Sequence, residues 1–100
     1  MMLPDQSRQG EHSELLSAAA EAKYGLLSRM EHVVLLAAAQ GAEDKEIAAQ
    51  LCCSISTVRT LWQRTYKKTR MTSRRQLIAT IWQEALRLAR LSSNERHDEA

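Results

Sequence analysis

Apolar residues recur along much of this chain at intervals of three and four positions, which is the spacing of one face of an α-helix. In the middle of the chain the pattern predicts two short helices joined by a tight turn. On the first, Ile47 and Leu51 are one turn apart and share a face. On the second, Val58 begins an inward face, and Ser54 can act as N-cap because its hydroxyl accepts a bond from a first-turn amide. The two helices are expected over residues 44–51 and 54–68.

The flanking segments predict further helices. Ser28 and Glu31 have the capping-box spacing at the start of one helix, which Gly41 ends. Residues 13–26 and 73–91 carry apolar stripes at helical spacing. The first of these stripes is formed by Leu15, Leu16, Ala19, Ala22 and Leu26. This N-terminal helix either covers exposed core or forms part of an oligomer interface, and the sequence leaves both open.

The predicted fold is therefore all-α, with a helix-turn-helix core of four helices, an extra N-terminal helix and a long C-terminal helix. The single domain is expected over residues 13–91, with the core at 27–77. The polar ends are expected to form a disordered N-terminus at 1–12 and a polar tail at 92–100.

The outward face of the second central helix is polar and basic. Such a face is what the second helix of a helix-turn-helix needs when it enters the major groove of DNA. Arginine can form a two-pronged contact with guanine, and glutamine with adenine. The predicted base contacts are Arg59, Thr60 and Gln63. The predicted phosphate contacts are Lys45, Ser54, Thr57, Arg64, Lys67 and Lys68.

Charge is unevenly distributed along the chain, although the formal net charge is only +2. Residues 59–90 hold nine lysines and arginines against one acid, Glu84, whereas residues 1–58 and 91–100 are net acidic. Basic runs alone usually form a solvated face. Here the run begins on the outward face of the predicted second helix, which favours a polyanionic partner such as double-stranded DNA.

The central half of the chain resembles a known family. The segment 27–77 is similar to the LuxR/GerE-type (NarL/FixJ-like) DNA-binding domain, here standing alone. In that family the positions of Arg59, Thr60 and Gln63 face the bases, and the last helix is where DNA-bound domains meet. The chain departs from the family pattern at Glu43, where a capping Ser or Asn is common, and its threonines at 65 and 69 replace apolar residues. The matching residues are Leu27, Ser28, Glu31, Val34, Leu35, Gly41, Lys45, Glu46, Ile47, Ala48, Leu51, Ser54, Thr57, Val58, Arg59, Lys68, Arg74 and Leu77.

The last predicted helix carries a wide apolar band that a small helix-turn-helix core could cover only in part. An exposed band of this kind usually marks an interface, which predicts a two-fold homodimer. The alternative is that residues 14–24 fold back and cover the band within one chain. The predicted dimer residues are Leu77, Ile78, Ile81, Trp82, Ala85, Leu88, Ala89 and Leu91.

Other classes of function find little support in the sequence. No apolar run approaches a membrane span, and the N-terminus lacks the features of a secretory signal, so we expect a cytoplasmic protein. The adjacent cysteines, Cys52 and Cys53, lack zinc-site spacing, and no metal site or cofactor is expected. A redox-sensing role for the pair is a minor alternative. His12, His32 and His97 lie in separate segments, so no catalytic site is expected.

The sequence therefore predicts a sequence-specific DNA-binding regulator of transcription. The alternative from another class is a helical interaction module, an anti-activator or co-regulator that binds a larger transcription factor. A resemblance to region 4 of sigma factors is a third option, although that region does not predict the long last helix.

Overall fold

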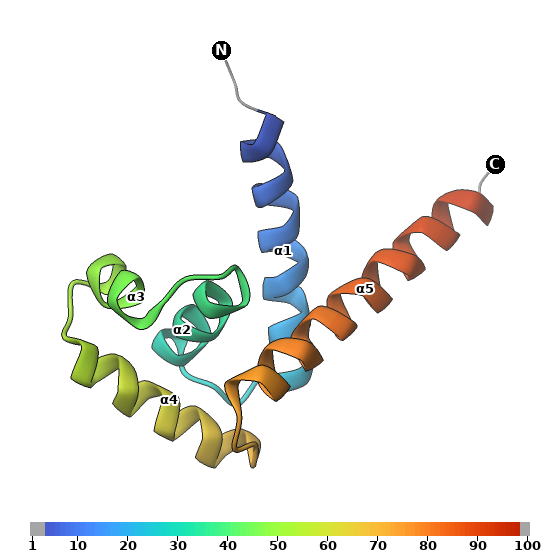
Figure 1. Ribbon diagram of the computed structural model, residues 1–100. Coiled ribbons are helices and arrows are strands. Elements are labelled where there is room, and N and C mark those ends of the chain that lie inside the picture. The colour runs from blue at the N-terminus through green and yellow to red at the C-terminus, as the bar shows by residue number, and fades with distance from the viewer. Residues whose placement is uncertain (1–3, 99–100) are drawn as a thin grey trace.

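The structure, a computed structural model, describes residues 4–98, with side chains described for residues 13–92. In that part of the chain all regular elements are helices (Figure 1), which confirms the predicted all-α class. Along the chain these are α1 (Pro4–Tyr24), α2 (Arg29–Ala39), α3 (Asp44–Leu51), α4 (Ile55–Thr69) and α5 (Arg74–Asp98).

Helix α2 lies at the centre and packs against each of the other four helices. Figure 1 shows α3 and α4 on one side of it and α1 and α5 on the other. Its side chains Val34 and Leu35 are fully buried, and Ala39 is buried, whereas Ala38 is partly exposed. The other buried apolar residues come from every helix and from the α1–α2 loop: Leu16, Ala19, Ala20, Leu27, Ile47, Ala48, Val58, Leu61, Trp62, Leu77, Ile81 and Ala85.

Local sequence signals set the boundaries of α2 and α3. The Ser28 hydroxyl accepts a hydrogen bond from the Glu31 amide (3.2 Å), and the Ser28 amide donates to the Glu31 carboxylate (2.8 Å). This is the capping box that the sequence predicts. Before α3, the Glu43 amide donates to the Glu46 carboxylate (3.1 Å), so Glu46 satisfies an amide of the first turn although Glu43 is not a usual capping residue.

The turn between α3 and α4 is short and left-handed. Cys52 has φ 54° and ψ 44°, and the Cys53 amide donates to the Ala48 carbonyl (2.9 Å), which closes the end of α3. The Ser54 hydroxyl then accepts from the Thr57 amide (3.1 Å) and caps α4. The structure thus confirms the predicted helix pair to within a residue at each end.

Both outer helices are longer than predicted. Helix α1 begins at Pro4, so residues 4–12 are helical where disorder was predicted. Proline is tolerated in a first turn because its missing N–H has no intrahelical partner there. Helix α5 continues to Asp98, beyond the predicted end at residue 91. The ends of the predicted disordered segment and tail, residues 1–3 and 99–100, lie outside the described residues.

Helix α1 makes its most extensive contact with α5. Leu16, Ala19 and Ala20 are buried on α1, and two of these are alanines, whose small side chains let the helices approach closely. At the edge of the contact, Lys23 Nζ lies 3.7 Å from the carboxylate of the buried Glu84. Ala22 and Leu26 were predicted on this stripe but are exposed. Ala22 lies within α1 on a side that does not face the core, whereas Leu26, 84% exposed, follows the end of α1 at Tyr24.

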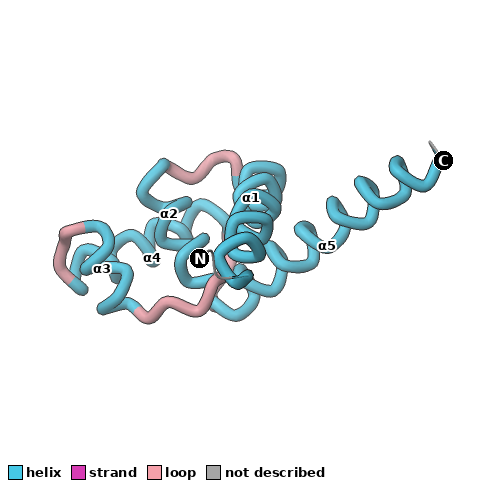
Figure 2. The backbone as a smooth tube through the Cα atoms, turned by 90° about the horizontal axis from the view of Figure 1, so that it is seen from above, coloured by secondary structure: helices cyan, strands magenta, loops and turns pink. Residues whose placement is uncertain are grey.

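Beyond this contact the two helices diverge. Figure 1 shows α1 and α5 separating toward their free ends, and in Figure 2 α5 extends well beyond the other helices. In the described part of the chain no helix combines the length and the apolar character needed to cross a membrane.

Candidate nucleic-acid interface

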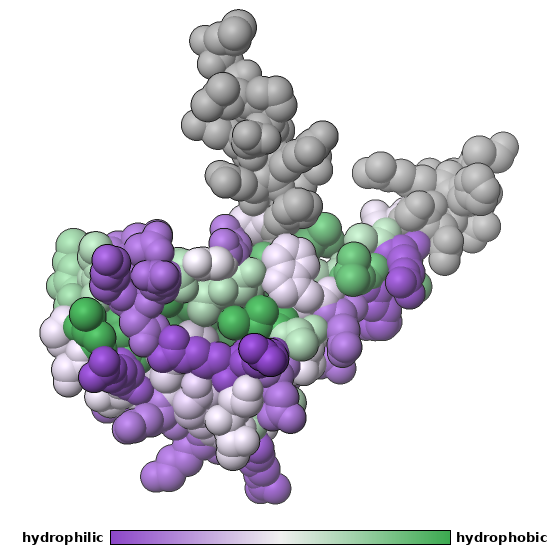
Figure 3. Space-filling view, in the orientation of Figure 1, coloured by the Kyte–Doolittle hydropathy of each residue, from purple (hydrophilic) through white to green (hydrophobic). Residues whose placement is uncertain are grey.

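Helix α4 has two faces of opposite character. Val58, Leu61, Trp62 and Thr65 are buried against the rest of the molecule. The other face is polar and exposed, and in Figure 3 hydrophilic side chains project from the lower side of the molecule, over α4. The exposed residues on this helix include Ser56, Arg59, Thr60, Gln63, Arg64 and Lys67. The helical phase read from the sequence therefore agrees with the observed burial of α4.

The three predicted base contacts all lie on the exposed face. Arg59 and Gln63 are one helical turn apart, so their side chains share one side of α4. The Thr60 hydroxyl donates to the Ser56 carbonyl (3.1 Å), which occupies its hydrogen. Thr60 can therefore offer a base only its oxygen lone pairs and its methyl group.

The predicted phosphate contacts divide into three groups. Lys45, Arg64 and Lys67 are exposed. Ser54 and Thr57 are also exposed, but their hydroxyls lie 3.0 Å apart and Ser54 caps the helix, so part of their hydrogen-bonding capacity is already used. Lys68 differs from all of these, because its ammonium group is paired with a buried carboxylate.

That carboxylate belongs to Glu31, at the start of α2. Lys68 Nζ lies 2.7 Å from Glu31 Oε1. Burial by itself raises the pKa of Glu31, but the hydrogen bonds from Lys68 and Ser28 outweigh it and hold the pKa below its ordinary value. The pair connects the C-terminal end of α4 with the N-terminal end of α2.

A second polar network joins α3, α4 and α5. Arg74 donates two hydrogen bonds to the Asp44 carboxylate (2.8 and 2.6 Å), and the Trp62 indole N–H donates to the same carboxylate (3.2 Å). The Arg74 guanidinium also lies 4.5 Å from the centre of the Trp62 ring, and the Tyr66 ring stacks on the Trp62 ring with 5.9 Å between ring centres. The hydrogen bonds from Arg74 lower the pKa of Asp44.

The sequence did not reveal these two networks. Asp44 and Arg74 are 30 residues apart, and Glu31 and Lys68 are 37 apart, so no local spacing connects them. The sequence also gave no role to Arg70, which is exposed at the end of α4 in a left-handed conformation (φ 60°). Arg70 lines an open groove beside α4 together with Thr60, Gln63, Arg64, Tyr66, Lys67, Met71 and Thr72. The only available signal for Arg70 was its place in the basic run.

The predicted dimer residues are only partly exposed. Leu77, Ile81 and Ala85 are buried within the chain, where α5 packs on α1 and α2, so these three are not available to a partner. The alternative in which α1 covers the band within one chain describes them better. Trp82 is partly buried, and its indole N–H donates to the Ala39 carbonyl (3.0 Å). Surface remains accessible on Ile78, Trp82, Leu88, Ala89 and Leu91.

Among residues 13–92, His32 lies apart from the two cysteines, Cys52 and Cys53. His32 Nε2 lies 3.1 Å from the Tyr24 carbonyl, which ties α2 to the end of α1. Both cysteines are free thiols, with Cys52 exposed and Cys53 partly buried. Among the described residues, no group of three or more His, Cys, Asp and Glu side chains is placed to hold a metal ion. The side chains of His12 and His97 lie outside the described residues.

Comparison with known proteins gives one match. The model of a family described as bacterial regulatory proteins, luxR family, matches residues 25–81. That range takes in α2, α3 and α4 and the first turns of α5. No curated protein and no solved structure matches the chain. Because the family match covers more than half of the chain and coincides with the helix-turn-helix whose geometry is described above, the protein belongs to the luxR family of bacterial regulatory proteins and carries its DNA-binding domain.

Proposed function

We propose that the protein is a sequence-specific regulator of transcription that inserts α4 into the major groove of DNA. The observation that carries the proposal is the exposed polar and basic face of α4, opposite a face that is buried in the core. Two polar networks hold α4 against α2, α3 and α5. A helix held in this way presents its outward side chains in a fixed geometry, which base recognition requires.

Arg59, Thr60 and Gln63 are proposed to contact base edges. Arginine fits the two acceptors of guanine in the major groove, and glutamine fits the donor and acceptor of adenine. Each good pair discriminates against a wrong base by about 1–3 kcal/mol. Lys45, Arg64 and Lys67, with Ser54 and Thr57 at the helix start, are proposed to contact phosphates and set the register. Arg70 extends the same basic surface toward α5.

We propose further that two copies bind DNA as a two-fold pair through the exposed part of α5. Leu88, Ala89 and Leu91 keep accessible apolar surface on α5. Leu88, which also packs against the core, and Ala89 are partly buried, and Leu91 is 47% exposed. A two-fold pair would place two α4 helices in successive major grooves, roughly 34 Å apart. Such a regulator acts where the chromosome lies, which in bacteria is the cytoplasm.

Selection of bound sequences from random duplex DNA tests the proposal. We expect a palindrome whose half-sites are centred about 10 base pairs apart. Affinity for the selected site should fall steeply as salt rises, because phosphate contacts release counterions. Failure to enrich any sequence, or an affinity that is insensitive to salt, would point instead to a helical module that binds another protein.

Light scattering tests the dimer separately. The parent is expected to be dimeric at tens of micromolar, and Leu88→Glu is expected to make it monomeric because a charge on the apolar strip opposes association. Thr80→Ala is the matched control on the same helix. Thr80 is partly exposed and its hydroxyl donates to the Gln76 carbonyl within α5, so this change should leave the measured molecular mass of the particle unchanged. A monomeric parent would contradict the dimer but not DNA binding.

A further inference from the structure

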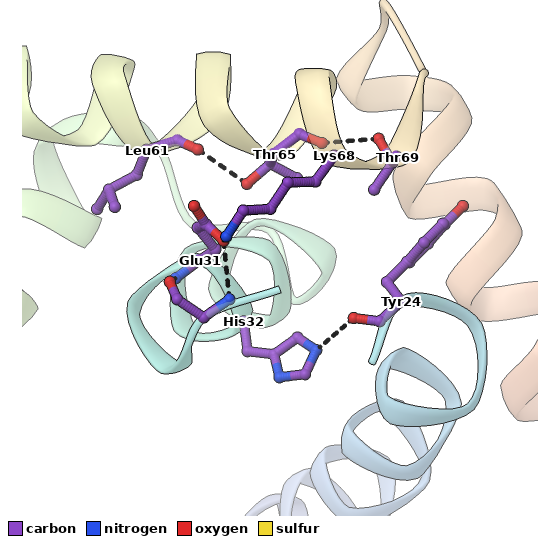
Figure 4. Close-up of polar contacts among 8 residues, drawn as sticks. Tyr24, Glu31, His32, Leu61, Thr65, Lys68 and Thr69 are labelled. Atoms are coloured by element: carbon purple, nitrogen blue, oxygen red, sulfur yellow. Dashed lines mark hydrogen bonds and ion pairs between the residues drawn. The ribbon is translucent and has the colours of Figure 1, made fainter. Parts of the chain in front are cut away.

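The adjacent lysines Lys67 and Lys68 differ in their surroundings. Lys67 is exposed, and it has no ion pair among the described residues. The Lys68 side chain is also exposed, by 41%, but it points toward α2, where its ammonium group meets Glu31, a side chain that is only 2% exposed (Figure 4). The two neighbouring lysines therefore have separate surroundings, although the sequence suggests the same role for both.

The Glu31 carboxylate is held in place by a hydrogen bond that does not involve Lys68. Its Oε1 atom accepts the Ser28 amide at 2.8 Å, and its own amide donates to the Ser28 hydroxyl at 3.2 Å. Next to it, the His32 ring holds the Tyr24 carbonyl at the end of α1. Moving the Glu31 carboxylate would undo the capping box of α2, so the carboxylate is a rigid acceptor.

The end of α4 is also constrained on this side. The hydroxyl of the fully buried Thr65 donates to the Leu61 carbonyl (2.8 Å), and the Thr69 hydroxyl donates to the Thr65 carbonyl (2.8 Å) (Figure 4). Both threonines satisfy their own hydrogen bonds within α4, so neither supplies a partner to Glu31. Of these groups from the end of α4, it is Lys68 that holds Glu31.

The comparison of the two possible partners of Lys68 favours Glu31. A phosphate contact is made at the surface, where salt screens the attraction between the ammonium group and the phosphate. Leaving Glu31 would strand a carboxylate in a buried position without its cation, and an uncompensated buried charge is strongly unfavourable. On these grounds the contact with Glu31 is the more favourable of the two for Lys68.

We propose that Glu31 withholds Lys68 from DNA, so that Lys68 is a positioning residue for the end of α4 and not a phosphate contact. This inference rests on the proposed DNA-binding function and refines its list of phosphate contacts. It implies that neutralising Glu31 releases a cation toward the duplex and so raises the number of phosphates the protein neutralises.

The test is the slope of log affinity against log salt on duplex DNA, measured for four variants beside the parent. Each phosphate contact contributes about 0.9 to this slope. Lys67→Met, the matched control, should make it shallower by about 0.9, whereas Lys68→Met should leave it unchanged and lower Tm by about 5–15 °C. Glu31→Gln keeps an acceptor for the Ser28 amide but loses the charge, so it should steepen the slope by about 0.9. Glu31→Gln with Lys68→Met should restore the parental slope.

Two results would overturn the inference. One is a slope that Lys67→Met and Lys68→Met reduce equally, and the other is a parental slope in Glu31→Gln. If Lys68→Met fails to fold, Glu31→Gln decides alone, because glutamine preserves the capping box. A parent that does not bind DNA at all would instead refute the proposed function, so the two failures are distinguishable.

Discussion

In the helix-turn-helix half of the molecule, α3 and α4 are joined to α2 and α5 by directional polar contacts. The Asp44 carboxylate accepts hydrogen bonds from Arg74 and Trp62, and the Glu31 carboxylate forms an ion pair with Lys68. The α1–α5 pair is instead joined mainly through apolar side chains, with an ion pair from Lys23 at the edge. Lys23 is about half exposed there, and such surface pairs contribute little to stability.

This difference corresponds to different tasks. Apolar contact is nearly independent of orientation, so it can hold two helices together without fixing their mutual rotation. A two-pronged contact such as Arg74 on Asp44 has a defined geometry and fixes it. The half that must present side chains to bases is therefore the half with the directional contacts.

The largest expected effect comes from Val58→Asp, which places an unpaired carboxylate in the fully buried side of α4. We expect the domain to lose its cooperative fold, because a charge without a partner cannot be accommodated there. Circular dichroism at 222 nm and thermal melting measure this. Ser56→Asp, on the exposed face of the same helix, should keep the parental melt. Parental helicity and Tm in Val58→Asp would mean that the assigned face of α4 is wrong.

The next effect separates the two halves. Ala19→Glu places a carboxylate in the α1–α5 contact and should destabilise the protein by about 2–4 kcal/mol. We expect α1 to detach and become sensitive to protease while α2–α4 stay folded. The matched control is Ala18→Glu, since Ala18 is exposed on the same helix. Loss of all helical signal in Ala19→Glu would show that α1 is an integral part of the helix-turn-helix core.

A change on the outward face should affect recognition without affecting stability. Arg59→Ala is expected to weaken binding to the selected site by about 1–3 kcal/mol and to relax preference at one position in each half-site. Its Tm should be parental because Arg59 is exposed. Competition binding with single-base variants of the site measures the preference. Unchanged affinity for the selected site would remove Arg59 from the base contacts.

The smallest expected effect is the fall of Tm at acidic pH. Asp44 and Glu31 have lowered pKa values in the folded protein, so the unfolded chain binds protons more readily at these positions. Their contribution to stability is complete above the ordinary carboxyl pKa of about 4 and is lost as pH falls through the lowered values. Tm should therefore fall as pH is lowered below about 4. Asp44→Asn and Glu31→Gln should each start from a lower Tm and decline less steeply.

A decline as steep as that of the parent in both variants would contradict this assignment. Glu84 also has a lowered pKa, caused first by the hydrogen bond from Arg87, and it lies in the α1–α5 half. Some acid sensitivity is therefore expected to persist in Asp44→Asn and Glu31→Gln.

The sequence predicted what depends on local spacing. Ile47, Leu51 and Val58 mark the inward faces of α3 and α4, and Ser28 and Ser54 mark the starts of α2 and α4 by a capping chemistry that acts over three residues. These signals are short-range, so they are visible without a structure. The family match over residues 25–81 confirms the resemblance found in the same segment.

What the sequence could not show depends on distance in three dimensions. The apolar band on α5 predicted an interface, but no spacing rule said whether a second copy or α1 would cover Leu77, Ile81 and Ala85. Lys67 and Lys68 looked equivalent because charge alone does not reveal that Glu31 lies beside one of them. The early start of α1 was missed because Pro4 and Gly10 suggested irregular structure, although proline suits a first turn.

Three of the helix ends contain a residue with positive φ, and only one of the three is a glycine. Gly41 follows α2 with φ 97°, whereas Cys52 after α3 and Arg70 after α4 hold the left-handed conformation with a Cβ atom. For an ordinary residue this conformation costs about 1–2 kcal/mol. Two helix ends therefore hold a residue in a conformation that glycine or asparagine adopts at a lower cost in free energy. At Cys52 glycine or asparagine would recover part of that free energy with no loss of charge. At Arg70 the same change would remove a cation from the basic groove. The turn between α3 and α4 is therefore the better place to begin engineering a more stable protein.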